Sequence, residues 1–341
     1  MVRRRRRAGG PDPLPAADAW FLSHGLTYFV PEVRAQVRSA LSPRRTVPLA
    51  VAVGLLGAGT GALLASVSGQ FSAAPAVLVS IGIAAAASYA LTVLRARPIV
   101  TWAVGRTLGS LRQLLPMMTR ALPLLLVFVT FLFINAEVWQ MSAALSTGTL
   151  WLTVLLFSGL AVAFLLVRLP EEVDLVDDAV DETFLRRACR GTPLEASCEE
   201  LLAEQAPDAA DPVALATVSG FERANLVIVL LVIQSVQILL LAVTVLAFFL
   251  LFGSLVMGAE VQETWTAMDP GTITSLPGLS SISLPLFQVS IFLAGFSVLY
   301  LTVSTVTDDT YREHFLASLV VELEQAVGMR AVYLALRARG D

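Results

Sequence analysis

The sequence predicts an all-α polytopic membrane protein, with six transmembrane helices in three hairpins plus cytoplasmic amphipathic helices. Hydrophobic residues make up 56% of the chain and charged residues only 15%, far from the balance of soluble domains. Six apolar runs, none with a charge in its middle, approach or exceed the roughly 20 residues that cross a hydrocarbon core of about 30 Å. These runs are continuous rather than alternating, which indicates helices and not a β-barrel. The predicted spans are residues 46–69, 73–94, 121–140, 150–167, 224–258 and 284–307.

The distribution of charge predicts the orientation. All 23 basic residues are arginine, and they lie in alternate connections between the spans. The remaining connections carry only acids, which are Glu137, Glu260, Glu263 and Asp269. Arginine-rich loops near spans stay inside, so we expect both termini to be cytoplasmic. Arginine used to the exclusion of lysine, with abundant Ala, Leu and Val, is typical of a GC-rich bacterium and predicts the bacterial plasma membrane.

The spans divide the chain into seven segments. The connection between the fourth and fifth spans is the only sizeable non-membrane region; it holds fourteen acids and fits two or three short helices, too few for an independent catalytic core. The predicted segments are a basic tail with an interfacial helix (1–45), hairpin 1 (46–97), an amphipathic helix (98–120), hairpin 2 (121–168), an acidic helical loop (169–223), hairpin 3 (224–307) and a C-terminal helix (308–341).

The chain begins with a run of five arginines, followed by Gly, Pro and Ala residues that predict disorder through residue 19. The run consists of Arg3, Arg4, Arg5, Arg6 and Arg7. Such a run favours anionic lipid headgroups at about 1 kcal/mol per residue. The alternative is a topology anchor that keeps the N-terminus inside. We do not expect nucleic acid as a partner, because no aromatic platform accompanies the run.

Two segments predict interfacial helices on the inner leaflet. Pro31 suits the first position of a helix, and Val33 and Val37 then share one face. In the second segment, Val104 and Leu108 keep helical spacing. That segment is either an interfacial helix or continuous with the third span.

Small residues in the first span predict a close helix contact. Gly57 and Gly61 form a GxxxG pair, and Gly54 and Ala58 extend the same small-residue surface. The partner is either the second span or a second copy of the chain in a homo-oligomer. The short SGQFS connection favours the second span.

A weak internal repeat relates spans three and four to spans five and six. The segment 136–138 reads Ala-Glu-Val at the end of the third span, and 259–261 reads the same at the end of the fifth. Both hairpins run in the same direction, so the repeat would be parallel. Chance similarity between Leu/Val-rich spans is the alternative.

Polar residues at membrane depth are the candidate functional residues. Asn135, Glu137, Gln234, Gln237 and Gln288 could form a polar path between the hairpins, with Glu137 as an outward-facing cation or proton site. The alternative is structural: Gln and Asn hydrogen-bond between packed helices, and Glu137 is solvated. No ionisable residue lies near the midplane, which argues against a pump or proton-coupled transporter.

The residues needed for catalysis and metal binding are sparse. His24 and His314 lie outside the spans, and Cys189 and Cys198 match no zinc spacing, so we expect free thiols, no metal and no cofactor. Without lysine there is no phosphate-binding loop. The acids of 171–182 lack the pattern of a calcium loop and fit a solvated helix face. We therefore expect a non-enzymatic protein.

With LRQLLPMMTRALPLLLVFVTFLFINAEVWQ and VTDDTYREHF, the chain resembles the uncharacterised multi-pass membrane proteins of actinobacterial type. The resemblance is one of general style and implies no particular activity. We expect a scaffold or regulatory component, with the lipid bilayer and a cytoplasmic protein as partners. A channel or secondary transporter is the alternative, and a lipid-modifying enzyme is a remote one.

Overall fold

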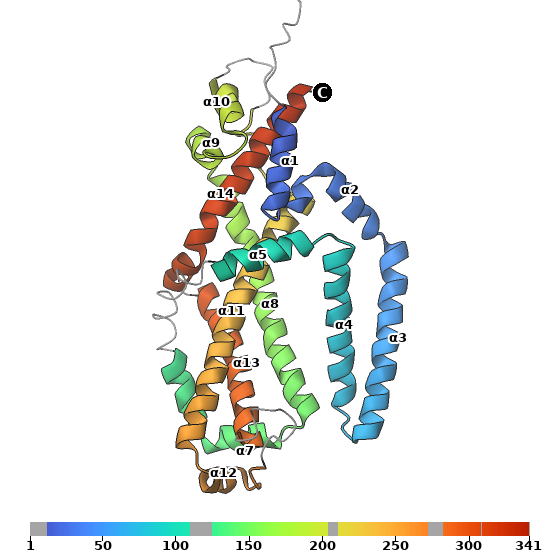
Figure 1. Cartoon of the computed structure of the whole chain (residues 1–341), viewed down its shortest axis with the longest axis vertical. Helices are drawn as coiled ribbons and strands as arrows, with labels where there is room; N and C mark the ends of the chain where they lie inside the picture. The colour runs from blue at the N-terminus through green and yellow to red at the C-terminus, as the bar shows by residue number, and fades with distance from the viewer. Residues whose placement is uncertain (1–11, 110–124, 204–210, 272–281, 308, 341) are drawn as a thin grey trace, which may run out of the picture.

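The computed structural model describes residues 12–109, 125–203, 211–271, 282–307 and 309–340. Its described elements are all helices, which confirms the predicted fold class (Figure 1). They are α1 (Pro13–Ser23), a 3-10 turn η1 (Thr27–Phe29), α2 (Pro31–Ala40), α3 (Pro43–Ser68), α4 (Ala73–Thr92), α5 (Arg97–Gly109), the helix Leu125–Phe133, α7 (Ala136–Ala144), α8 (Thr147–Asp178), α9 (Glu182–Cys189), α10 (Glu195–Ala203), α11 (Gly220–Val256), α12 (Ala259–Thr266), α13 (Leu284–Thr307) and α14 (Asp309–Gly340).

The long helices α8, α11 and α13 form a central bundle, and the hairpin of α3 and α4 stands to one side of it (Figure 1). One end of the bundle carries a cap made of α1, η1, α2, α5, α9, α10, α14 and the adjoining ends of α8 and α11. The opposite, distal end carries the short helices α7 and α12. Five of the described helices are long and apolar enough to cross a membrane, and the bent pair around Asn135 makes a sixth if it is one span.

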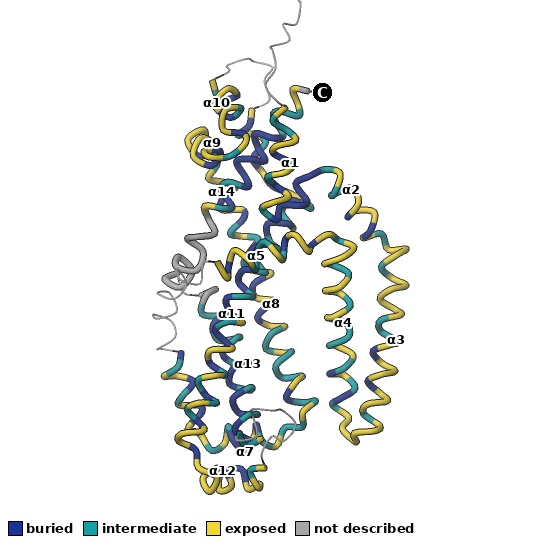
Figure 2. The backbone as a smooth tube through the Cα atoms, viewed as in Figure 1, coloured by how far each residue is buried: buried dark blue, intermediate teal, exposed yellow. Residues whose placement is uncertain are grey.

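Helix α11 organises both the bundle and the cap. Its buried residues recur every three or four positions from Glu222 to Gly253, so one face of the helix packs over its whole length. Several apolar residues between them, such as Leu239 and Leu251, are exposed, which suits a lipid-facing side. Figure 2 shows the same contrast: α11 and α13 are largely buried, whereas α3 and α4 are largely exposed.

The third span differs from the prediction at its distal end. Residues 121–140 were expected to be one helix, but the helix ends at Phe133, and α7 leaves it at 74°. Asn135 begins α7 by accepting a hydrogen bond from the Glu137 backbone N–H at 2.8 Å. The indole N–H of Trp139 donates to the carbonyl of Phe133 at 2.7 Å, which satisfies a group that the ended helix leaves free.

The first hairpin confirms the intramolecular glycine contact and limits it to two of the four residues. A Cβ on Gly61 would lie 2.6 Å from the Ala74 carbonyl oxygen, and one on Gly57 would lie 2.9 Å from Leu78. Both glycines therefore press against α4. Gly54 has nothing within 4 Å of an added Cβ, and Ala58 is exposed, so neither makes the predicted contact.

The cap contains more helix than the sequence predicted. The expectation of disorder through residue 19 is wrong from Pro13, where α1 begins after an Asp12 cap. Helix α8 continues past the predicted boundary at 168 to Asp178, because Leu169, Val173 and Val176 extend its buried face into the cap. The described part of the second interfacial segment is α5, which lies across the bundle and buries Ile99, Ala103 and Thr107. The residues Arg3 to Arg7 lie outside the described part of the chain.

The two Ala-Glu-Val segments of the proposed repeat lie at the same end of the molecule. The two Ala-Glu-Val segments begin α7 and α12, which are both short helices at the distal end, and each follows a span. These helices pack together, with the Trp139 and Trp265 rings 6.2 Å apart. Each is followed by a long helix of the bundle, α8 in one case and α13 in the other.

Candidate functional site

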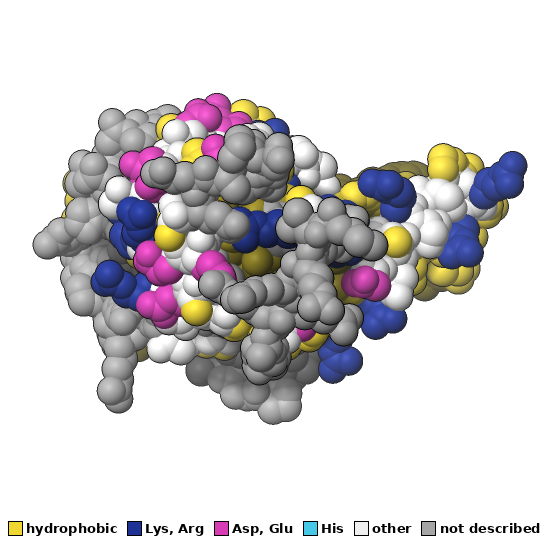
Figure 3. Space-filling model, turned by 90° about the horizontal axis from the view of Figure 1, so that it is seen from above, with side chains coloured by type: hydrophobic (Ala, Val, Ile, Leu, Met, Phe, Trp, Pro, Cys, Tyr) yellow, Lys and Arg dark blue, Asp and Glu magenta, His cyan; other side chains and the backbone are white. Residues whose placement is uncertain are grey.

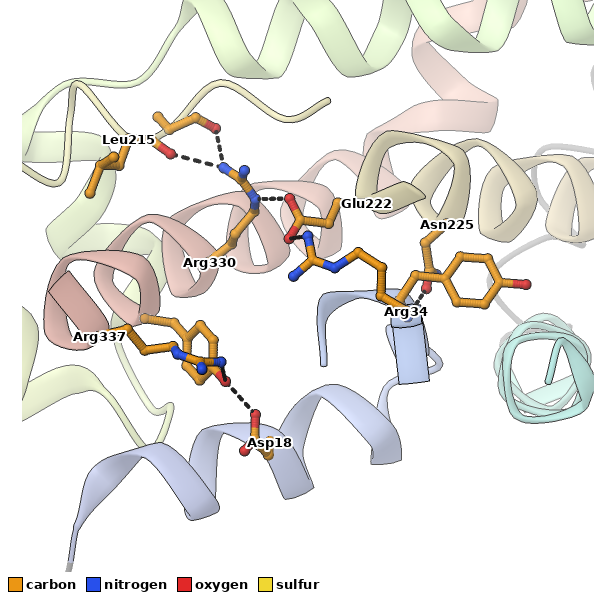
Figure 4. A network of polar contacts seen from close by, with 10 residues as sticks. Asp18, Arg34, Leu215, Glu222, Asn225, Arg330 and Arg337 are labelled. Carbon is orange, nitrogen blue, oxygen red and sulfur yellow. Dashed lines mark hydrogen bonds and ion pairs between the residues drawn. The ribbon is translucent and has the colours of Figure 1, made fainter. Parts of the chain in front are cut away.

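The most extensive buried polar cluster in the described structure lies in the cap, where α11 begins (Figure 4). Glu222 is in the first turn of α11, and only 3% of its surface is exposed. Its two oxygens accept hydrogen bonds from Arg34 of α2 and from Arg330 of α14, each at 2.6 Å. One carboxylate thus joins the N-terminal segment, the longest span and the C-terminal helix.

The Arg330 guanidinium is itself almost fully buried. Besides Glu222, it donates to the carbonyl oxygens of Leu215 at 2.8 Å and Ala216 at 3.3 Å. These carbonyls belong to the connection that leads into α11, so Arg330 also positions that connection. A buried charge requires such compensation, because an uncompensated one costs several kcal/mol.

Asn225 lies one turn further along α11 and is completely buried. Its side-chain amide donates to the Gly25 carbonyl at 2.9 Å and accepts from the Tyr28 backbone N–H at 2.8 Å. Gly25 has a φ of +71°, a conformation that glycine adopts without strain. The amide of Asn225 therefore holds the turn between α1 and η1 against α11.

A second contact joins α1 to α14. The Tyr333 hydroxyl donates to Asp18 at 2.8 Å and accepts from Arg337 at 3.3 Å. Burial, together with the bond to Asp18, raises the pKa of Tyr333 to about 12. Tyr333 thus remains neutral over the physiological range and acts as a hydrogen-bond donor.

The residues of the predicted polar path are not gathered in one place. Asn135 and Glu137 are exposed at the distal end, where α7 begins. Gln288 is near the same end and donates to the Leu145 carbonyl at 3.1 Å. Gln234 and Gln237 are buried in the half of α11 nearer the cap. Sixteen residues, or about 24 Å along the helix, separate Gln237 from Gly253, which contacts α13 close to Gln288.

The two cysteines lie together inside the cap, and the thiol of Cys189 is held in its protonated form. Cys189 of α9 and Cys198 of α10 are both buried and unbridged. A hydrogen bond with Cys198, followed by burial, raises the pKa of Cys189. A raised pKa disfavours the thiolate, which is the nucleophilic and metal-binding form. Within the described residues, no group of three His, Cys, Asp or Glu side chains is placed to hold a metal.

A cavity of about 210 Å³ lies between the cap and the bundle. Trp20, His24 and Trp102 line one side, and Leu230 and Ile233 of α11 line another. An ion pair between Arg106 and Glu322 closes its edge. The His24 ring stacks on Trp20 at 4.1 Å, and its Nδ1 is 2.8 Å from the Trp20 carbonyl, so the histidine is held in place by its own helix.

Comparisons with models of protein families, with curated proteins and with solved structures found no match. The fold and the contacts of the cap therefore define the class of protein: an all-α polytopic membrane protein whose two terminal segments are joined to its longest span by buried ion pairs.

The sequence reasoning missed the central residues of this cluster. Counting the fifth span from Ala224 placed Glu222 and Asn225 at its margin, where polar residues are common. A usable signal was present at Arg330, which stands alone in the apolar stretch from Val327 to Leu336. An isolated charge on an otherwise apolar helix predicts a buried partner.

Proposed function

We propose that the protein is a non-enzymatic scaffold or regulatory component of the bacterial plasma membrane, and that it works through its cap. We place the cap and both termini in the cytoplasm. The described arginines support this orientation, because they lie on the cap side of the spans, while the distal helices carry only acids.

The observation that carries the proposal is where the buried polar contacts lie. Glu222 with Arg330, and Asn225 one turn further along α11, make buried polar contacts within the cap, whereas the polar residues of the spans are scattered. A cap clamped onto the spans by buried ion pairs has a defined geometry. A defined surface is what a membrane component needs in order to position or regulate a cytoplasmic protein.

The small helices α9 and α10 are the part of the cap best suited to a partner. Glu182 and Glu199 are more than half exposed, and they pair with Arg186 only at 3.5 and 3.6 Å. Exposed ion pairs contribute little to stability, so these carboxylates can exchange their partner at small cost. The complementary surface on a partner would be basic.

Site-specific photocrosslinking in the native host tests this proposal. A photoreactive amino acid placed at Glu199 should capture a defined cytoplasmic protein, and the same residue at Glu263 of α12 should not. For the charge test, the photoreactive residue is moved to Glu200, another exposed position of α10, so that Glu199 can be substituted. In that chain the double variant Glu182→Arg/Glu199→Arg should abolish the capture. The matched variant Glu260→Arg/Glu263→Arg should leave it intact. If α10 captures only the protein itself, or nothing that depends on its charge, the proposal fails.

A second candidate function, transport of a solute across the membrane, is favoured by one observation at Gln237. Its Oε1 is buried in α11 and has no hydrogen-bond partner among the described residues. An orphaned oxygen in a span is a place where water or an ion could bind. The test is ion flux through the purified protein in liposomes. If the protein conducts ions, and if Gln237→Leu abolishes the flux while Glu137→Gln reduces it, the protein is a transporter or channel rather than a scaffold.

A further inference from the structure

The α3–α4 hairpin is covered only slightly by the rest of the described protein. Only 11% of the apolar window of α3 and 6% of that of α4 is buried, compared with 50% for α11. Helix α3 packs chiefly against α4, and α4 meets α8 near the distal end, where Ser72 and Trp151 make polar contacts. Bound lipid can therefore contribute to the position of this hairpin in a way that the bundle does not need.

The two helices of the hairpin touch at one end and leave a groove at the other. Gly57 and Gly61 press against α4 in the distal half. Towards the cap, a groove of about 450 Å³ opens between the helices, within the range of small-molecule sites. Val53, Gly54, Gly82 and Ala86 are among its lining residues, so its wall is almost entirely apolar.

Polar groups mark the cap end of this groove. Thr46 of α3 and Tyr89 of α4 line it there, and the Tyr89 hydroxyl donates to the Ala40 carbonyl at 2.8 Å. Arg44 and Arg45 directly precede Thr46. Arg95 follows Tyr89 by six residues and lies just beyond the end of α4 at Thr92. Arginines thus flank the groove at the level where lipid headgroups lie.

These arginines lack acidic partners. Arg44, Arg45, Arg95 and Arg97 are exposed and take part in no ion pair within the described structure. The sequence contains no Asp or Glu between Glu32 and Glu137. Seen from the cap end, basic side chains gather over the part of the molecule that projects with this hairpin (Figure 3).

We propose that the groove between α3 and α4 binds an anionic phospholipid of the leaflet on the cap side. One acyl chain lies between Val53 and Ala86, and the phosphate is held by Arg44, Arg45, Arg95 and Arg97. The two halves of the site match the two halves of such a lipid: an apolar wall within the membrane and unpaired cations above it.

Charge decides between this occupant and a second copy of the chain. Docking the same hairpin of another copy about a two-fold axis would bring eight unpaired arginines together. Like charges at close range oppose that contact, whereas a phosphate neutralises them. The small residues of the groove alone would not distinguish the two occupants.

Native mass spectrometry of the full chain, delipidated and then exchanged into nanodiscs, tests the proposal. The nanodiscs contain phosphatidylcholine with or without phosphatidylglycerol. Wild type should retain phosphatidylglycerol in preference to phosphatidylcholine. Arg44→Gln/Arg45→Gln should lose about twenty-five-fold in retention, because each surface arginine contributes about fivefold. An added Cβ at Gly82 would meet no protein atom within 4 Å, so the leucine of Gly82→Leu would occupy the groove. This variant should also retain less phosphatidylglycerol.

Two variants serve as matched controls. Gly59→Leu adds the same side chain to α3 at a position that is open but outside the groove. Arg190→Gln removes an exposed arginine of the cap that is in no ion pair of the described structure. Both should retain lipid as wild type does. Helix content and monodispersity of each variant establish that it is folded.

Three outcomes would overturn the proposal. The first is equal retention of phosphatidylcholine and phosphatidylglycerol by wild type. The second is unchanged phosphatidylglycerol retention in both the arginine and the Gly82 variants. The third is a wild-type dimer that Gly82→Leu converts to monomer, which would make a second copy the occupant.

Discussion

Glu222→Gln is expected to be the most destabilising isosteric change in the cap. The substitution keeps the shape of the side chain and removes its charge. It leaves Arg330, whose side chain is only 9% exposed, without the carboxylate that it meets at 2.6 Å. Arg34 is affected less, because 26% of its side chain reaches solvent.

The size of the effect follows from these contacts. Breaking a buried ion pair by neutralising one partner costs about 3–5 kcal/mol. Arg330 keeps its two carbonyl acceptors in the connection before α11, so we expect the lower end, about 3 kcal/mol. Replacing both members, as in Glu222→Leu/Arg330→Met, should recover part of the loss, because no buried charge is then left uncompensated.

Reversible unfolding in mixed detergent micelles gives the free energy of unfolding. Hydrogen exchange should also rise in α1, α2 and α14 but not at the distal end. The control is Glu324→Gln, which removes the same charge from a pair with the exposed Arg187 and should cost less than about 1 kcal/mol. If Glu222→Gln also costs less than about 1 kcal/mol, the buried cluster does not hold the cap as argued.

Three further predictions concern other parts of the molecule. Gly61→Leu should separate α3 from α4, because a Cβ at this position would lie 2.6 Å from the Ala74 carbonyl oxygen. The rate of disulfide trapping between cysteines placed on the two helices measures the separation. A rate equal to that of Gly59→Leu would contradict the prediction. Trp139→Phe should lower the free energy of unfolding by about 1–3 kcal/mol, because the Phe133 carbonyl loses its donor; a neutral effect would show that the bend at Asn135 does not depend on this bond. Tyr333 has a pKa of about 12 in the folded state against about 10 when unfolded, so its stabilising effect is complete below pH 10 and is lost as the pH rises through 12. The free energy of unfolding of Tyr333→Phe, measured against pH, should therefore fall less over this range than that of wild type. Some fall should remain in the variant, because burial also raises the pKa of Tyr28.

The bend in the third span shows why local sequence was insufficient. Residues 121–140 are apolar enough for a single helix, and Asn135 alone does not end one. The helix ends at Phe133 because Trp139 can satisfy its carbonyl and because α12 lies where α7 can pack on it. That partner is more than a hundred residues away in the sequence, so no local pattern reports it.

The glycines of the first hairpin show a partial success. The GxxxG spacing predicted a close contact, and Gly57 and Gly61 make it. The same pattern included Gly54 and Ala58, which do not. Helices that cross at an angle touch over a limited length, and the crossing point depends on both helices. The sequence of one helix therefore identifies a surface but not where its contact ends.

The sequence by itself determined the class of protein and the approximate positions of five spans, the bent third span excepted. Both follow from the cost of placing polar groups in hydrocarbon, which acts on composition and length alone. Only the tertiary structure decided which face of each span is buried, because residues that face lipid and residues that face protein are equally apolar. It also decided that Glu222, Arg34 and Arg330 meet, since they lie as far as 296 positions apart and their attraction requires the folded cap to bring them within 2.6 Å.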